Sequence, residues 1–177
     1  LVMDPDAKTT LAFVDNDETG DRSFSFYRKP GADMMLREDE VNYKLIDNCR
    51  IFHFGSLSMT DEPVRSATYA MVDYAKKKNK IISFDPNLRP PLWESEDLAT
   101  KQIWYGIEQC DILKIADNEI EWLTGTDDYD KGIMLKEVLK LKGLTLDEVA
   151  TFGDGLNDVC MLEGFPYSFT PANGCKE

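Results

Sequence analysis

The chain has 177 residues, with 20 lysines and arginines against 33 aspartates and glutamates, and a formal charge of −13. This length suits one ordinary domain, and a charge of this sign repels nucleic-acid backbones and anionic membranes. The apolar runs, such as those near residues 81–84 and 149–152, are far shorter than the ~20 apolar residues of a membrane helix. We therefore expect neither nucleic acid nor a membrane as a partner.

Four cysteines, at positions 49, 110, 160 and 175, are widely spaced. They form no C-x-x-C pair, and a single histidine is present to join them, so the sequence does not favour a zinc site. No basic stretch followed by an apolar core and a cleavage site opens the chain, which argues against a signal peptide. Reduced thiols in a cytoplasmic protein are the simplest interpretation.

The first elements in chain order are two predicted strands. Residues 9–14 and 23–27 are rich in β-branched and aromatic side chains, which favour extended structure. The polar stretch 15–22 between them contains Gly20 and predicts a turn. These residues therefore predict an antiparallel hairpin.

Strands and helices then alternate. Short apolar runs predict strands at 51–54, 81–84 and 112–114, and apolar residues at helical spacing predict helices at 62–78, 98–109 and 118–123. The prolines of segment 85–91 fit neither a helix nor a strand ladder, so this segment is a predicted loop. The alternation predicts an α/β fold, a parallel sheet with helices on both faces, from which the hairpin projects as a flap. Ligands of such folds bind beyond the carboxyl ends of the strands.

A different pattern begins near residue 131. A predicted helix at 133–142 stops at Gly143, and residues 146–149 lead to a predicted strand. The letters GDGLND follow at 153–158. The join near residue 130 therefore separates two predicted parts of the chain.

Several motifs of the first part occur in the order in which one enzyme family carries them. They are AKTTLAFV at 7–14, FYRKPGAD at 26–33, FHFGSLS at 52–58, SFDPNLR at 83–89 and KIADNE at 114–119. Over about residues 7–129 the chain resembles PfkB-type sugar kinases, and fructokinases in particular. The resemblance implies a ribokinase-like fold whose β flap closes over the sugar. It also implies phosphoryl transfer from ATP, with Mg²⁺, to a hydroxyl of fructose or a related sugar.

The resemblance implies that Arg28, Asp85, Asn87 and Arg89 contact the sugar or the transferred phosphate. Their chemistry suits this role, because an arginine offers a rigid fork of donors and the loop at 85–89 follows a parallel strand. Two plainer interpretations stay open. Arg28 could be an exposed arginine at a strand end, and Asp85 and Arg89 could form an ion pair that braces the loop.

Glu119 matches the glutamate of the family's N-x-x-E element, which organises magnesium and phosphate, while Ala116 stands where the family has asparagine. The alternative for Glu119 is a solvated acidic start of a helix. His53 lies between two phenylalanines, which favours a buried, hydrogen-bonded histidine over a catalytic base.

Two parts of such a kinase are missing from the sequence. The first is the G-A-G-D turn, whose amides hold the developing charge and whose aspartate deprotonates the sugar hydroxyl. The second is the amino-terminal sugar-binding segment with its Gly-Gly and Asn. We therefore expect the chain alone to be inactive as a kinase.

The second part resembles the carboxyl-terminal segment of haloacid-dehalogenase-type sugar phosphatases. The resemblance implies that Asp154 and Asp158 bind Mg²⁺, that Asn157 orients them and that Lys131 offsets charge on an aspartyl phosphate. A bare acidic loop is the alternative. Such phosphatases also need a D-x-D nucleophile, and Asp15 and Asp17 fit these letters. We assign them to the hairpin, because the alternating residues 23–27 that follow predict a strand and not a helix.

The sequence thus predicts a fructokinase-like part at residues 1–129 and a partial Rossmann-like phosphatase tail at 130–177. Its favoured function is that of a carbohydrate kinase acting on fructose. A magnesium-dependent sugar-phosphate phosphatase and a non-catalytic sugar-binding or interaction protein are the alternatives. A homo-oligomer formed through the flap or through exposed sheet edges is a further prediction.

Overall fold

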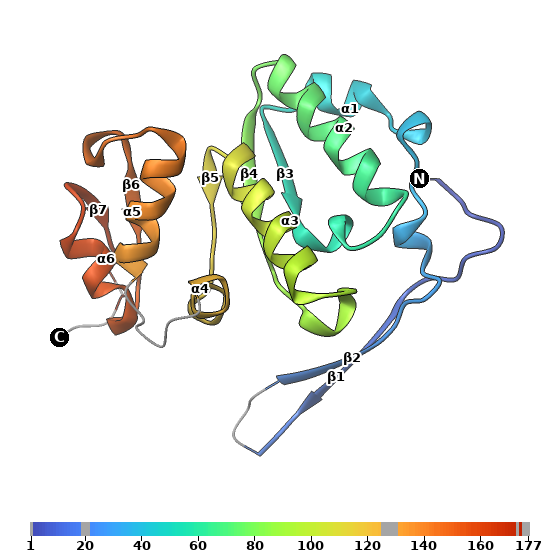
Figure 1. The fold of residues 1–177 in the computed structure, drawn as a ribbon, viewed down its shortest axis with the longest axis horizontal. Coiled ribbons are helices and arrows are strands. Elements are labelled where there is room, and N and C mark those ends of the chain that lie inside the picture. Colours follow the sequence, from blue (N-terminus) through green and yellow to red (C-terminus); the bar gives the residue numbers. More distant parts are fainter. Residues whose placement is uncertain (1, 19–21, 125–130, 173, 175–177) are drawn as a thin grey trace. The chain divides into compact units, whose positions relative to one another are not determined.

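The computed structural model describes residues 2–18, 22–124, 131–172 and 174 (Figure 1). The chain divides into two compact units, Leu1–Lys114 and Ile115–Glu177. Among the described residues, every helix is too short or too polar to span a bilayer.

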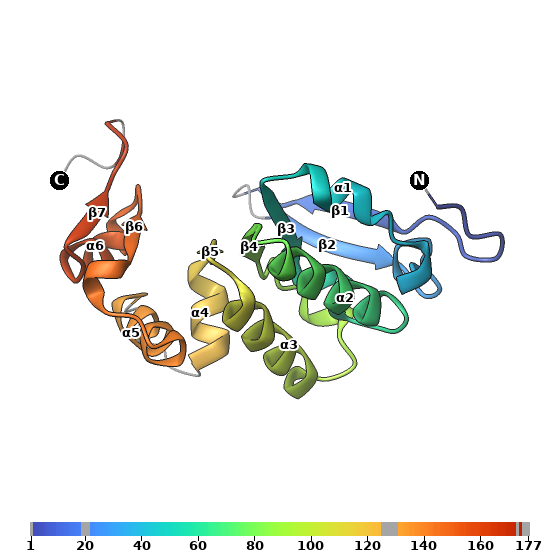
Figure 2. The same ribbon diagram turned by 90° about the horizontal axis from the view of Figure 1, so that it is seen from above.

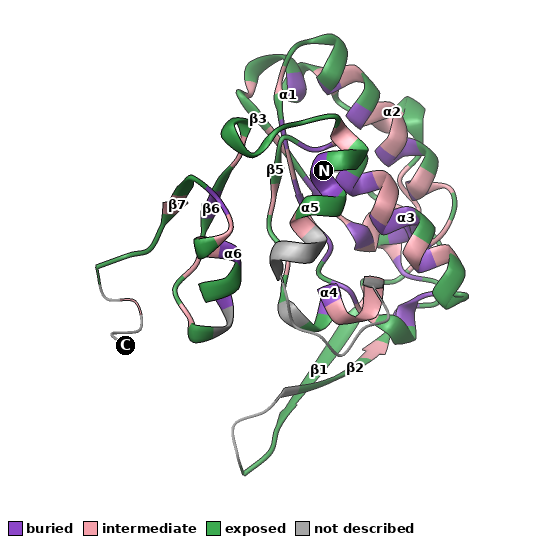
Figure 3. Ribbon diagram, turned by 60° about the vertical axis from the view of Figure 1, so that its left-hand side comes forward, coloured by how far each residue is buried: buried purple, intermediate pink, exposed green. Residues whose placement is uncertain are grey.

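The hairpin of the first unit consists of β1 (Leu11–Asn16) and β2 (Arg22–Tyr27). The strands are antiparallel, with Leu11 opposite Tyr27, which confirms the predicted hairpin. Asp15 was expected in the turn but pairs with Ser23, because the ladder continues into polar residues that point to solvent. Both strands are exposed along most of their length (Figure 3).

A parallel sheet follows, made of β3 (Ile51–Gly55), β4 (Ile81–Asp85) and β5 (Ile112–Leu113) in that order. Helix α2 (Val64–Lys77) joins the first two strands, and α3 (Glu96–Gln109) joins the last two. Helix α1 (Tyr43–Asn48) packs against α2. These elements confirm the predicted alternation of strands and helices.

Both connecting helices cover the same face of this sheet (Figure 2). The reason is the strand order: successive right-handed crossovers that advance in one direction place their helices on one side. The core lies between this face and the helices. Its fully buried side chains include those of Ala67, Val72, Ile82, Phe84, Ile103 and Ile107.

The opposite face of the sheet carries exposed side chains of the first unit. The pairing register places Ile51 beside Ile81, and Ser83 beside both His53 and Ile112. The three isoleucines are exposed by 51, 41 and 48% respectively. Within the first unit, the connecting helices α2 and α3 therefore cover one face of the sheet and not the predicted two. We name this surface, made of Ile51, His53, Ile81, Ser83 and Ile112, the open sheet face.

The second unit contains two strands, β6 (Ala150–Phe152) and β7 (Tyr167–Phe169), which pair in parallel. Its helices are α4 (Asp117–Thr124), α5 (Lys131–Lys142) and α6 (Val159–Glu163), and α5 packs against the other two. Helix α5 ends at Gly143, whose positive φ of 65° suits a glycine. The predicted helix and strand of this region are confirmed, although the strand begins after a short 3₁₀ turn, η5 (Leu146–Glu148).

Candidate functional site

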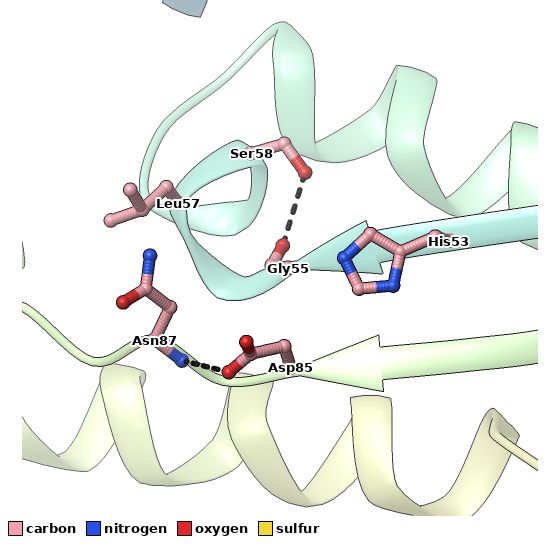
Figure 4. A pocket seen from close by; sticks show the side chains of 6 residues that line it. All are labelled: His53, Gly55, Leu57, Ser58, Asp85 and Asn87. Atoms are coloured by element: carbon pink, nitrogen blue, oxygen red, sulfur yellow. Dashed lines mark hydrogen bonds between the residues drawn. The ribbon is translucent and has the colours of Figure 1, made fainter. Parts of the chain in front are cut away.

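A pocket of about 270 Å³ lies at the carboxyl ends of β3 and β4 (Figure 4). Strand ends of this kind are the usual ligand sites of parallel sheets. The pocket is lined by His53, Gly55, Leu57, Ser58, Asp85 and Asn87. The first four belong to β3 and the 3₁₀ turn after it, η3 (Ser56–Met59), and the last two to the end of β4 and its loop.

The two loops around this pocket are held closely together. The Ser56 amide donates to the Pro86 carbonyl at 3.3 Å, and the Ser58 hydroxyl donates to the Gly55 carbonyl at 3.2 Å. A Cβ atom at Gly55 would lie 3.0 Å from the Asp85 carbonyl oxygen, so this position favours glycine. The loops therefore present their polar groups from a fixed backbone.

Asp85 accepts two interactions at the edge of the pocket. Its Oδ2 lies 2.7 Å from the Lys114 ammonium, and its Oδ1 accepts the backbone N–H of Asn87 at 3.2 Å. The alternative interpretation paired Asp85 with Arg89, whereas in the structure Asp85 pairs with Lys114, the lysine that follows β5. Asn87 has a φ of 45°, a left-handed conformation that asparagine tolerates. Its side chain points towards the loop that carries Leu57 (Figure 4).

Arg28 lies outside the pocket lining and holds the loop that forms one wall. It is buried, with 7% of its surface exposed, so the interpretation as an exposed strand-end arginine is wrong. Its Nε donates to Asp33 at 2.8 Å, and its Nη atoms donate to the Thr60 hydroxyl at 2.9 Å and the Leu57 carbonyl at 2.8 Å. The arginine thus joins the base of the hairpin to η3.

Arg89 lies between the pocket loop and the hairpin. Its guanidinium carbon is 4.9 Å from the ring centroid of Phe24 in β2, a cation–π geometry. Its Nη1 also donates to the Leu88 carbonyl at 2.9 Å. The structure therefore brings Asp85 and Asn87 into the pocket and places Arg28 and Arg89 around it.

His53 lines the pocket, and of its predicted burial and hydrogen bond only the hydrogen bond is confirmed. The side chain is exposed rather than buried, because it points from the open sheet face, and its Nδ1 lies 3.1 Å from the Ser83 hydroxyl. Sequence reasoning also missed Leu57 and Ser58 as lining residues and Lys114 as the partner of Asp85. These residues could have been found from the predicted parallel sheet, because residues that follow neighbouring parallel strands lie at the same edge of the sheet.

Glu119, in the second unit, has an internal partner. It is 4% exposed, and its Oε2 accepts the Ala116 backbone N–H at 2.9 Å. A glutamate at the third helical position that reaches back to the N-cap amide is half of a capping box. The alternative of a solvated helix start is therefore wrong, and this carboxylate helps to begin α4.

The two aspartates of the tail are held in a compact turn. Asp158 is buried, and its Oδ2 accepts the backbone N–H groups of Asp154 at 2.9 Å and Gly155 at 3.1 Å. Asp154 is exposed. Among the described residues, no three histidine, cysteine, aspartate or glutamate side chains come together as a metal site. The Lys131 and Asn157 side chains lie outside the part that the structure describes.

Comparisons with known proteins identify the family. The sequence profile of pfkB family carbohydrate kinases matches residues 1–146, which is most of the chain. The chain belongs to this family. The match confirms the kinase resemblance and continues beyond residue 129, where the predicted phosphatase tail begins. That tail stays a prediction from the sequence.

The pfkB chain is similar to fructokinases in sequence and structure. It is 45% identical to probable fructokinase-2 of Arabidopsis thaliana over 149 residues, which are 82% of this chain and 45% of that protein. Among solved structures, it matches the ATP-bound fructokinase of Xylella fastidiosa with a TM-score of 0.68 and 34% identity, over 78% of this chain and 42% of the other. It matches the fructokinase of Vibrio cholerae O395 with fructose, ADP and calcium bound at a TM-score of 0.64 and 29% identity, over 79% and 43%. The chain therefore spans less than half of each of these relatives.

Proposed function

We propose that this chain is part of a fructokinase, an enzyme that transfers a phosphoryl group from ATP to a hydroxyl of fructose, and that it contributes part of the sugar site. The observation that carries the proposal is the polar pocket at the carboxyl ends of β3 and β4 in a pfkB family chain. The fructose- and nucleotide-bound fructokinases that share its fold support the choice of sugar and phosphoryl donor.

The pocket offers the groups that recognise a sugar. The Asp85 carboxylate accepts hydrogen bonds from hydroxyl groups, and the Asn87 amide both donates and accepts. The Ser58 hydroxyl and the His53 ring lie on the opposite wall. The Lys114 ammonium lies 2.7 Å from Asp85 Oδ2 and holds that carboxylate at the edge of the pocket. We assign the sugar hydroxyls to Asp85 and Asn87, and we assign Arg28 and Arg89 to positioning the loop and the flap around them.

Phosphoryl transfer needs groups that the described residues do not assemble. Glu119, the residue proposed for magnesium and phosphate, uses its carboxylate to cap α4, and no cluster suited to a metal occurs among the described side chains. The proposed contribution of this chain is to bind and orient the sugar.

Fructose titration of the purified chain, followed by calorimetry, tests the proposal. We expect saturable binding that Asp85→Asn weakens about ten- to a hundredfold, since a hydrogen bond to a charged group contributes about 1.5–3 kcal/mol. Asn87→Gly should weaken it about threefold, because glycine keeps the left-handed backbone and removes only the amide. Lys101→Gln, an exposed change on α3, is the matched control. Absence of saturable binding, or equal affinity in all four proteins, would disprove the proposal.

A sugar-phosphate phosphatase is the second candidate, and it rests on the G-D-x-x-N-D letters of residues 153–158. In that function Asp154 and Asp158 bind Mg²⁺, Asn157 orients them, and Lys131 offsets phosphate charge. The occupied Asp158 carboxylate does not favour it. A cytoplasmic location and self-association through the hairpin or sheet edges accompany the kinase proposal.

A further inference from the structure

A second hollow of the first unit lies along the outer side of α2. Its volume is about 420 Å³. We name it the tyrosine groove. It is lined by Glu38, Tyr43, Ser66, Tyr69, Ala70, Asp73, Tyr74 and Lys77. The proposed kinase function uses none of these residues.

The groove follows from the spacing of residues on α2. Positions 66, 70, 73 and 77 recur every three or four residues and therefore share one side of the helix. Small Ala70 leaves space between larger neighbours. The second wall comes from Glu38 in the 3₁₀ turn η2 (Glu38–Glu40) and from Tyr43 in α1.

Tyrosine rings form much of the surface of the groove. The Tyr43 and Tyr74 rings meet with centroids 4.6 Å apart, and Tyr69 meets Tyr105 of α3 at 4.4 Å. Both pairs are tilted and held by neighbouring helices. Such rings present negative faces to a cation and apolar surface to methylene groups. One ring already does so, because the Lys78 ammonium lies 5.2 Å from the centroid of Tyr74.

Two carboxylates of the groove have no hydrogen bond or ion pair to any described residue. These are Glu38 and Asp73. Nearby carboxylates are engaged: Asp47 accepts the Tyr74 hydroxyl at 2.9 Å, and Glu62 accepts the Ser66 hydroxyl at 2.7 Å. The charges of the two groove carboxylates act on the rings. Burial is the larger cause of the raised pKa values of Tyr43 and Tyr105. The negative charge of Glu38 raises the pKa of Tyr43 further, and that of Asp73 raises the pKa of Tyr105 further.

We propose that the tyrosine groove binds an aliphatic diamine or polyamine, with ammonium groups paired to Glu38 and Asp73 and the methylene chain on the tyrosine rings. The combination of aromatic faces and unpaired carboxylates matches both parts of such a ligand. The net charge of −13 attracts it towards the protein. This inference is independent of the proposed sugar site.

Lys77 is a positively charged residue of the groove, so its replacement should have the opposite effect to replacement of a carboxylate. It lies four residues after Asp73 on α2, a spacing at which a lysine competes for the carboxylate. Removal of its charge should therefore strengthen diamine binding, whereas removal of either carboxylate should weaken it. A purely structural role for these side chains would not produce opposite effects.

The experiment is an NMR titration of the full chain with cadaverine, compared with the neutral diol of the same chain length. We expect saturable shifts of the groove tyrosines with the diamine and none with the diol. Glu38→Gln and Asp73→Asn should each weaken binding about two- to fivefold, and Lys77→Gln should tighten it about twofold, as for exposed ion pairs. Asp39→Asn, next to Glu38 but outside the groove, is the control of equal charge.

Three outcomes would overturn the inference. An equal loss in Asp39→Asn would mean that the acidic chain attracts cations without a site. Binding of the diol would mean that the ammonium groups are not recognised. Weaker binding after Lys77→Gln, in a variant whose circular dichroism matches the wild type, would contradict the pairing with Asp73.

Discussion

Gly106 of α3 approaches Phe84 of β4 so closely that a Cβ atom on the glycine would lie 2.3 Å from a ring carbon. Phe84 is fully buried, so its ring has little room to move. Gly106→Ala should therefore destabilise the first unit by about 1–3 kcal/mol through overpacking, although alanine favours helices. Urea unfolding measures the loss, and Phe84→Leu in the same chain should recover part of it. An alanine variant as stable as the wild type would contradict this close packing.

Arg28 should be important for stability because each of its nitrogen atoms has a partner within the chain. Arg28→Lys keeps the charge but loses the fork of donors, and we expect a loss of about 1.5–3 kcal/mol in unfolding free energy. Lys29→Ala, at the exposed neighbour, should change stability by less than about 0.5 kcal/mol. Equal stability of Arg28→Lys and the wild type would show that the arginine is not a clamp.

Tyr105 should make the stability of the fold depend on pH in the alkaline range. Burial, with smaller effects from Asp73 and Tyr69, raises its pKa to about 12 from an ordinary value of 10.0. Because the unfolded chain ionises first, the stabilisation is complete below pH 10.0 and is lost as the pH rises towards about 12. Unfolding followed over this range should show the loss in the wild type and a smaller loss in Tyr105→Phe. Tyr27→Phe, at an exposed site, should behave as the wild type.

Magnesium should bind the chain weakly. Asp158 already accepts two backbone N–H groups, and Mg²⁺ gives up its water reluctantly, so we expect affinity on the order of millimolar at best. Calorimetric titration of the wild type and Asp154→Asn checks this. Micromolar binding that disappears in the variant would support the phosphatase alternative.

The isolated chain should not phosphorylate fructose. The G-A-G-D turn is absent from its sequence, and loss of a general base alone costs about 10²–10⁴-fold in rate. A coupled assay with ATP and fructose measures the product. Fructose phosphate that forms with the wild type and not with Arg89→Ala would refute this expectation.

Much of the fold could be predicted from local patterns. Alternation at residues 23–27, helical spacing along α2 and prolines after β4 each report a local preference of the backbone. The open sheet face could not be predicted, because it depends on strand order. The residue pattern of one strand carries no information about which strands lie beside it. Arg28 was misjudged for a related reason: its partners Leu57 and Thr60 are about thirty residues away in the sequence.

The candidate site was predictable in part. The loop at 85–89 was recognised from its position after a strand, and Asp85 and Asn87 do line the pocket. The contribution of β3 and η3 requires knowledge of which strand lies beside β4. For Glu119 the sequence allowed two interpretations, because its spacing from Ala116 fits both a capping box and a catalytic element. The hydrogen bond from the Ala116 backbone N–H shows that it caps α4.

The open sheet face has a consequence for how the chain behaves with hydrophobic dyes. Dyes such as ANS fluoresce on exposed apolar surface, and strong fluorescence is commonly taken as the mark of a molten globule. Here Ile51, Ile81 and Ile112 offer such a surface while the helix-covered side of the same sheet is closely packed. The chain should therefore bind the dye and still show sharp near-ultraviolet circular dichroism from its buried aromatic side chains. For this protein, dye fluorescence measures the uncovered side of a folded sheet and gives no information about disorder in the core.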